Sequence, residues 1–187
     1  MTTAPLVFHV KENVHGALIG QVLPHNSTST IVPGTQFLIV NQKDVPDIAI
    51  MKDGSLHAVQ GLDRETKQNY SITVLADSLR GIGIFQVRII VDDENDNAPE
   101  FTSFIYDGQI MENSPVGTEV TLTNSIVASD KDEGKNGEFT FVLEGENSSL
   151  FRINPLTGRI YFQGIDERTL DRESKMNYEF QVIATDT

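Results

Sequence analysis

The sequence predicts an all-β protein made of two tandem β-sandwich units. Three observations support this fold class: one pattern occurs twice along the chain, apolar residues alternate along short runs, and turn signals separate those runs. The length of 187 residues suits two small domains, because single domains most often hold roughly 100 to 150 residues. Apolar residues make up 39% of the chain, which is enough for compact cores.

The internal repeat is the strongest of these observations. The tetrapeptide Leu-Asp-Arg-Glu occurs at 62–65 and again at 170–173, 108 residues later. The other matching pairs are NYSITVLA (69–76) with NYEFQVIA (177–184), and VKENVHGALIGQV (10–22) with IMENSPVGTEVTL (110–122). A fixed order of matching segments indicates two copies of one structural unit.

Period-two alternation predicts strands in both copies. In residues 85–91 and 178–184 every second residue is apolar, as in a strand with one buried face. The predicted inward residues are Phe85, Val87, Ile89 and Val91 in the first run, and Tyr178, Phe180, Val182 and Ala184 in the second. Turn signals such as Asp53-Gly54 and Asn154 to Gly158 punctuate the runs. No helical stripe longer than a turn or two is present.

The acidic stretch VDDENDNAPEF (91–101) marks the predicted boundary between the units, because Pro99 ends ladder hydrogen bonding. The first unit is predicted to span residues 1–98, with residues 92–98 as a linker, and the second to span 99–187. The second copy stops before a strand that would match residues 83–91. We therefore expect a fragment of a longer multi-repeat protein.

Charge and composition exclude several function classes. The net charge of −13 argues against a surface for nucleic acid or anionic lipid, because both would repel the chain. The sequence has no Cys and four scattered His, so neither a disulfide framework nor a hydrolase site is indicated, and no small-molecule substrate is expected. No apolar run approaches the length of about 18 residues that spans a bilayer.

Acidic residues gather at four places where strands are expected to end. These places are Glu12, the pair Asp63 and Glu65, the stretch Asp93 to Asn97, and DKDEGKN (130–136). Taken singly, each is compatible with a solvated turn. Taken together, they offer the carboxylate, amide and carbonyl oxygens that calcium prefers, whereas zinc favours His or Cys and magnesium requires stricter geometry.

The motifs LDRE, DENDNAPEF, DKDEGKN and ATD, in this order, resemble the calcium motifs of extracellular cadherin repeats, and the resemblance covers essentially the whole chain. It implies Greek-key sandwiches and about three calcium ions at one complete interdomain joint. By this resemblance, two ions would be held by Glu12, Asp63, Glu65, Asp93, Asp96 and the carbonyl of Glu94, with Asp132 from the second unit. A third would be held by Asn95, Asp130, Asp132 and Asp186 with the carbonyls of Asn97 and Asn136. Without metal, these converging carboxylates would repel one another and the joint would flex.

The pattern is broken at two places. Residues 23–37 contain no DxDxGxN segment, and Ser78 stands where the second copy has Asp186, so no calcium joint is expected at that end of the first unit. The second unit carries the set Glu112, Asp171 and Glu173, which resembles half of a further joint. The sequence also lacks Trp, so adhesion by exchange of an N-terminal Trp is not expected.

The resemblance implies a calcium-dependent cell–cell adhesion ectodomain that binds another cadherin, homophilically or heterophilically. The alternative is a structural spacer or mechanical tether whose recognition surfaces lie elsewhere in the parent chain. An enzyme is not expected. An extracellular location is expected, as the ectodomain of a single-pass plasma-membrane protein whose membrane segment lies outside this sequence, and the sequons at Asn26, Asn69 and Asn147 would be glycan acceptors.

Overall fold

The computed structural model describes residues 4–22, 31–164 and 170–186. The chain divides between Glu94 and Asn95 into two compact units, which are described separately. This division lies in the acidic stretch, slightly before the predicted boundary at residue 98. Among the residues described, no helix is long and apolar enough to cross a membrane.

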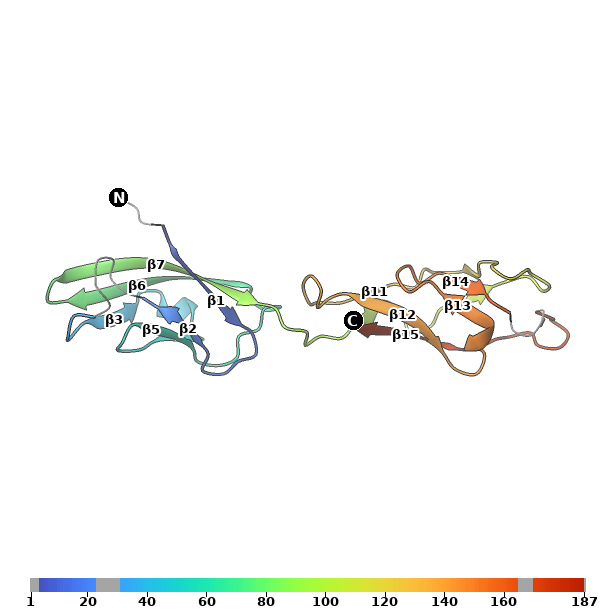
Figure 1. Ribbon diagram of the computed structural model, residues 1–187, viewed down its shortest axis with the longest axis horizontal. Helices are drawn as coiled ribbons and strands as arrows, with labels where there is room; N and C mark the ends of the chain where they lie inside the picture. The colour runs from blue at the N-terminus through green and yellow to red at the C-terminus, as the bar shows by residue number, and fades with distance from the viewer. Residues whose placement is uncertain (1–3, 23–30, 165–169, 187) are drawn as a thin grey trace. The chain divides into compact units, whose positions relative to one another are not determined.

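Unit 1 is a sandwich of two β-sheets (Figure 1). One sheet has the strand order β1-β7-β6-β3, with β1 parallel to β7 and the other pairs antiparallel, and the second has the order β2-β5-β4. The elements are β1 (Leu6–Lys11), β2 (Leu18–Gln21), β3 (Gln36–Ile39), a single 3-10 turn η1 (Gln42–Asp44), β4 (Ile48–Ile50), β5 (Ser55–Ala58), β6 (Asn69–Ser78) and β7 (Gly81–Asp92).

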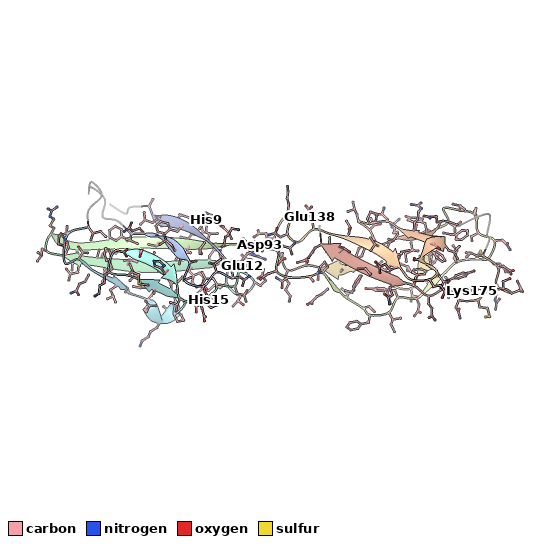
Figure 2. The ribbon with its side chains drawn as sticks, turned by 60° about the horizontal axis from the view of Figure 1, so that its bottom comes forward. His9, Glu12, His15, Asp93, Glu138 and Lys175 are labelled. Atoms are coloured by element: carbon pink, nitrogen blue, oxygen red, sulfur yellow. The ribbon has the colours of Figure 1, made fainter. Side chains whose placement is uncertain are left out.

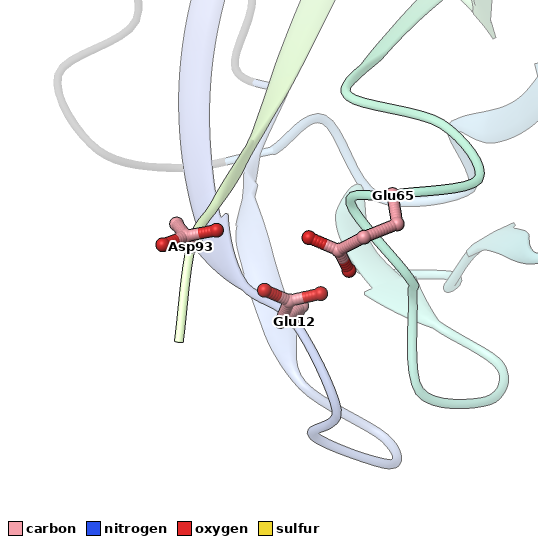
Figure 3. A group of neighbouring side chains, drawn as sticks. All are labelled: Glu12, Glu65 and Asp93. Carbon is pink, nitrogen blue, oxygen red and sulfur yellow. The ribbon is translucent and has the colours of Figure 1, made fainter. Parts of the chain in front are cut away.

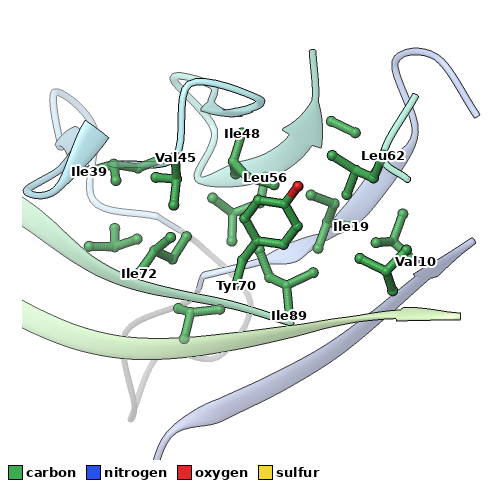
Figure 4. Packing of buried hydrophobic residues seen from close by; sticks show 14 of the residues in the cluster. Val10, Ile19, Ile39, Val45, Ile48, Leu56, Leu62, Tyr70, Ile72 and Ile89 are labelled. Atoms are coloured by element: carbon green, nitrogen blue, oxygen red, sulfur yellow. The ribbon is translucent and has the colours of Figure 1, made fainter. Parts of the chain in front are cut away.

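The core of unit 1 lies between these sheets (Figure 4). Along β7 the predicted alternation is observed: Val87, Ile89 and Val91 are buried, and Phe85 is half-buried against them. From the facing sheet, Leu56 and other apolar side chains close the core. Burying such side chains contributes about 1.5 to 3 kcal/mol each, so the alternating pattern itself holds the two sheets together.

Unit 2 is also built of strands, in shorter pieces (Figure 1). The elements are β8 (Glu100–Phe101), β9 (Gly108–Gln109), β10 (Thr121–Leu122), β11 (Ala128–Ser129), β12 (Phe139–Glu144), the 3-10 turn η2 (Ser148–Leu150), β13 (Phe151–Ile153), β14 (Ile160–Phe162) and β15 (Gln181–Asp186). The antiparallel pairs are β8 with β11, β9 with β10, β12 with β15, and β13 with β14. The all-β prediction is confirmed.

Aromatic side chains fill the core of unit 2. The ring of Phe151 packs against those of Phe162, Tyr178 and Phe180, with centroids 5.0 to 6.1 Å apart. Tyr178 and Phe180 therefore face inward as predicted, but β15 begins only at Gln181. Strand pairing explains the late start of β15, because the residues of β12, from Phe139 to Glu144, pair only with residues 181–186.

Two of the three sequons lie in described structure. Asn69 begins β6 and has an exposed side chain, whose Oδ1 accepts hydrogen bonds from the Arg88 guanidinium. Asn147 precedes η2, donates from Nδ2 to the carbonyl of Glu179 and accepts from Lys175 Nζ through Oδ1. The third sequon, at Asn26, lies outside the described residues, as does part of segment 23–37.

Candidate metal-binding sites

Three carboxylates of unit 1 converge where β1 and β7 end. Oxygens of Glu12, Glu65 and Asp93 all lie within 4.8 Å of one another. Glu12 follows β1, Asp93 follows β7, and Glu65 lies in the turn before β6, so three separate segments supply the group that Figure 3 shows. Figure 2 places Glu12 and Asp93 at this end of the unit. We call Glu12, Glu65 and Asp93 the acidic triad.

Backbone amides hold Glu12 at the centre of the acidic triad. The residue is fully buried, and its two carboxylate oxygens accept hydrogen bonds of 2.9 Å from the amides of Arg64 and Glu94. The next residue, Asn13, has a left-handed φ of 60° and donates its amide to the carbonyl of Leu62. A buried carboxylate needs such donors, so the local backbone is built around this side chain.

Asp63, predicted as a ligand, does not join the acidic triad. Its Oδ1 accepts from the Thr66 amide at 3.0 Å and its Oδ2 accepts from the Thr66 hydroxyl at 2.8 Å. These bonds, the hydroxyl first, lower the pKa of the Asp63 carboxyl below its ordinary value. In the described structure Asp63 therefore caps the turn that presents Glu65.

A residue that the sequence reasoning overlooked lies inside this site. Arg64 is 4% exposed, and its guanidinium forms ion pairs with Glu65 and Asp93. The sequence does contain a signal for this residue, because the arginine belongs to the repeated Leu-Asp-Arg-Glu motif. The Glu94 carboxylate, which lies beside the acidic triad, forms an ion pair with Lys11. The main-chain carbonyl of Glu94 is the group that the resemblance implies as a metal ligand.

In unit 2, Asp132 is the centre of a second group. The residue is 8% exposed, and its Oδ2 accepts from the amides of Asp96 and Asn97 at 3.2 Å each. Its Oδ1 accepts from Asn97 Nδ2 at 2.6 Å. The pairing of β11 with β8 brings these segments together, since Ser129 lies opposite Glu100 and the two acidic segments adjoin that pair.

Asp130 and Asp186 complete this second group. Asp186 ends β15 opposite Phe139, the residue that begins β12 just after DKDEGKN. Asp130 Oδ2 and Asp186 Oδ1 are buried, and neither accepts a hydrogen bond within the described part of the chain. Burial raises the pKa of the Asp186 carboxyl above its ordinary value, and the negative charges of Asp130 and Asp132 raise it further. We call Asp130, Asp132 and Asp186 the aspartate cluster.

Glycines shape the loop that carries the aspartate cluster. Gly134 has a left-handed φ of 61°. A Cβ on Gly137 would lie 2.4 Å from the main-chain oxygen of Asp132, so the backbone can pass there only without a side chain. The Asp132 amide donates to Asp130 Oδ1 at 2.9 Å, which tightens the same loop. Of the other predicted ligands, Asn95 is exposed and Asn136 donates its amide to the Glu133 carbonyl.

Unit 2 also repeats the acidic triad in part. Oxygens of Glu112, Asp171 and Glu173 lie within 4.8 Å of one another. The Arg172 amide donates to Glu112 at 3.2 Å, as the Arg64 amide does to Glu12 in unit 1. Asp171 accepts from the Ser174 hydroxyl, as Asp63 does from Thr66, and this lowers the pKa of the Asp171 carboxyl. The two copies thus agree at the level of single hydrogen bonds.

The donor chemistry of all three groups suits a hard divalent cation. Every candidate ligand atom is an oxygen, and no His or Cys belongs to any of the three groups. The two buried carboxylate oxygens without hydrogen-bond donors, on Asp130 and Asp186, are the kind of atoms that a cation would satisfy. The residues present therefore fit calcium.

Comparison with known proteins identifies the family of the chain. A family model described as Cadherin domain matches residues 106–187. Unit 1 lies outside that match, yet it shares with unit 2 the LDRE motif and the hydrogen bond from its arginine amide to a glutamate.

Curated cadherins show similarity over most of the chain. Cadherin-89D of Drosophila melanogaster is 35% identical over 204 residues, covering 81% of this chain and 9% of that protein. Human protocadherin Fat 4 is 42% identical over 138 residues, covering 71% of this chain and 2% of that protein. The chain is therefore made of cadherin-superfamily repeats. It spans less than a tenth of the length of these relatives.

Solved cadherin structures match both units. Mouse cadherin-23 EC22-24 gives a TM-score of 0.73 at 27% identity, covering 97% of this chain and 57% of that one. Chicken VE-cadherin EC1-2 gives 0.70 at 26% identity, covering 98% and 90%. The protocadherin gammaB7 EC3-6 cis-dimer structure gives 0.68 at 26% identity, covering 96% and 41%. The tandem sandwich fold is the cadherin fold.

Proposed function

We propose that this chain is part of the ectodomain of a cadherin that mediates calcium-dependent cell–cell adhesion. One observation carries the proposal. The acidic stretch gives Asp93 to the acidic triad of unit 1, while the amides of Asp96 and Asn97, a few residues later, bind Asp132 of unit 2. A stretch tied to an acidic group in each unit is suited to bind cations that act on both.

Calcium is the proposed cation, and about three ions would be held. The proposed ligands are Glu12, Asp63, Glu65, Asp93, Glu94, Asn95, Asp96, Asn97, Asp130, Asp132, Asn136 and Asp186. Asp63 would have to share or release its hydrogen bonds to Thr66 in order to bind. Extracellular calcium modules often bind at about 10⁻⁴ to 10⁻³ M, so a modest affinity is expected.

Calcium would act on structure rather than on chemistry in this proposal. Without an ion, carboxylates a few ångströms apart repel by an amount on the order of kilocalories per mole at moderate dielectric. Bound calcium would offset that repulsion, and ligands drawn from both units would restrict the motion of one unit relative to the other. A stiffened pair of repeats can then present its surfaces to another cadherin.

Scattering with and without calcium tests this role. We expect the maximum dimension and flexibility of the chain to change when a chelator removes calcium. The variant Asp96→Ala should lose most of that response while each sandwich stays folded, and Asp107→Ala, outside the proposed ligands, should respond as wild type. Indifference of the wild-type scattering curve to calcium would remove the basis of the proposal.

An apolar row on unit 1 favours a binding role over that of a plain spacer. Leu38, Leu75 and Ile84 lie side by side on β3, β6 and β7 of one sheet. Leu38 is 59% and Ile84 62% exposed on the face away from the core. Contiguous exposed apolar residues often mark protein interfaces. We propose that this row meets another cadherin, either a second copy or a different chain.

Sedimentation distinguishes the proposed adhesive function from that of a structural spacer or mechanical tether. A homophilic cadherin should associate with itself at high concentration in calcium, whereas a spacer should remain monomeric. The cis-dimer of protocadherin gammaB7 is a precedent among similar structures.

An extracellular location follows from the proposed adhesion. Of the two described sequons, the exposed Asn69 is the better placed for a glycan, because Asn147 uses both of its side-chain polar atoms in hydrogen bonds.

A further inference from the structure

The acidic triad already holds a positive charge from its own chain. The guanidinium of Arg64 forms ion pairs with Glu65 and Asp93, which are two of the three members. The pairing atoms are Nε toward Asp93 and a terminal nitrogen toward Glu65, so one planar group bridges two carboxylates. Arginine suits this geometry better than lysine, because its donors are arranged as a rigid fork.

The positive charge of Arg64 offsets only part of the negative charge of the acidic triad. Glu12, the third member, is held by two backbone amides and is fully buried. The Arg64 side chain is 5% exposed, and those of Glu65 and Asp93 are 19% and 11% exposed. Ion pairs this far from solvent are screened much less than surface pairs.

We propose that Arg64 is a built-in counter-cation of unit 1, which stabilises the acidic triad without metal and competes with a divalent cation for Glu65 and Asp93. The inference rests on the proposed function for the identity of that cation, calcium. The competition follows from charge alone. If the guanidinium stays in place it repels the incoming ion, and if it withdraws its ion pairs are lost. In both cases Arg64 raises the calcium concentration at which unit 1 is filled.

Unit 2 provides an internal contrast. The amide of Arg172 donates to Glu112 as the amide of Arg64 does to Glu12, so the backbone role is repeated. The Arg172 side chain is exposed, and in the described part of the chain no ion pair joins it to Glu112, Asp171 or Glu173. The counter-cation role therefore belongs to the guanidinium of Arg64 and not to the motif as such.

Calcium titration of three variants of the whole chain tests the proposal. Arg64→Met keeps an unbranched side chain of similar reach and removes the charge, Arg64→Lys keeps the charge without the fork, and Arg172→Met is the matched control. By calorimetry in calcium-free buffer, we expect Arg64→Met to bind calcium about tenfold more tightly than wild type. Arg64→Lys should stay within about threefold of wild type, and Arg172→Met should be unchanged.

A second measurement addresses the metal-free state. In chelator, Arg64→Met should lower the melting temperature of unit 1 by at least about 5 °C, because it leaves buried carboxylates without their partner. Hydrogen exchange of the β1 and β7 amides identifies which unit melts. Calcium should restore most of the lost stability in Arg64→Met, since the ion then replaces the missing charge.

The outcomes separate this inference from the proposed function. Wild-type chain that binds no calcium would overturn the proposed function and the competition with it. Wild-type binding together with equal or weaker binding by Arg64→Met would overturn the counter-cation role alone, and would indicate that Arg64 positions the ligands. A melting temperature in chelator that Arg64→Met leaves unchanged would likewise overturn that role.

Discussion

The main-chain oxygen of Asp132 lies 2.4 Å from the point at which Gly137 would carry a Cβ atom. Real Cβ atoms do not approach a backbone oxygen so closely, so the loop closes on itself only because residue 137 is glycine. The same loop places the Asp132 carboxylate against the amides of Asp96 and Asn97. Gly137 is thus a requirement of the aspartate cluster although it offers no side-chain ligand.

Gly137→Ala should therefore displace Asp132 and weaken unit 2. Overpacking of this kind costs about 1 to 3 kcal/mol, which corresponds to roughly 4 to 8 °C per kcal/mol in a domain of this size. The melting temperature in calcium measures the loss. Lys135→Ala, an exposed substitution in the same loop, is the control. A Gly137→Ala protein that melts and binds calcium as wild type would show that the loop relaxes freely.

Asp186→Asn should have opposite effects with and without metal. Asp186 Oδ1 is buried without a hydrogen-bond donor beside Asp130, so removing its charge relieves repulsion in the metal-free unit. In chelator the variant should melt above wild type, and added calcium should raise its melting temperature less. Asp107→Asn serves as the control. A variant that melts below wild type in chelator would contradict the repulsive role.

The turn between β4 and β5 should give a pH-dependent contribution to stability. The Asp53 carboxylate accepts from the Ser55 hydroxyl at 2.6 Å and from the Ser55 amide at 3.0 Å, and these bonds lower its pKa. A group whose pKa is lower in the folded state stabilises the fold above its unfolded pKa of about 3.9, and this stability is lost as pH falls through the folded pKa.

Asp53→Asn should thus be less stable than wild type at pH 7, and the difference should shrink as the pH falls below about 4. Urea unfolding at a series of pH values measures the difference. Asp77→Asn, at an exposed position of β6, controls for the loss of one negative charge. A difference that stays constant with pH would show that the carboxylate charge is not what stabilises the turn.

The apolar row on unit 1 gives a prediction about association. Leu38→Glu and Ile84→Glu should each weaken self-association at least about tenfold, because a charged group would replace apolar contact area. Sedimentation in calcium measures the dissociation constants. Gln86→Glu, on the same face of β7, adds the same charge outside the row. Equal weakening by Gln86→Glu would mean that added charge, and not the row, controls association.

Much of the fold could be predicted from the sequence, because the signals were periodic and repeated. The alternation over Phe85 to Val91 identified the buried face of β7, and the repeated LDRE motif identified two copies of one unit, which make equivalent hydrogen bonds in the structure. The start of β15 was missed by several residues, since Tyr178 alternates like a strand residue yet has no ladder partner on β12. The ends of a strand depend on which residues of the neighbouring strand can pair with it. The apolar alternation of a single strand does not contain that information.

The ligand set stays a prediction, although the structure brings several of its members together. The convergence of Glu12, Glu65 and Asp93 agrees with the motif resemblance, whereas the engagement of Asp63 with Thr66 depends on a turn that the motif does not specify. Arg64 was not predicted as a site residue, because an arginine between two acidic residues is typical of a surface charge. Its burial follows from how the turn packs, which only the three-dimensional structure contains.

The parallel pairing of β1 with β7 has a consequence for load. Strand β1 begins at Leu6 and strand β7 ends at Asp92, and these residues lie at opposite ends of the same ladder. Tension applied between the two ends would act along the strands, so every hydrogen bond of the ladder would resist in shear at once. Under the proposed adhesive function, tension would reach unit 1 through these two ends, and the β1–β7 ladder would have to break before the rest of the unit could unfold.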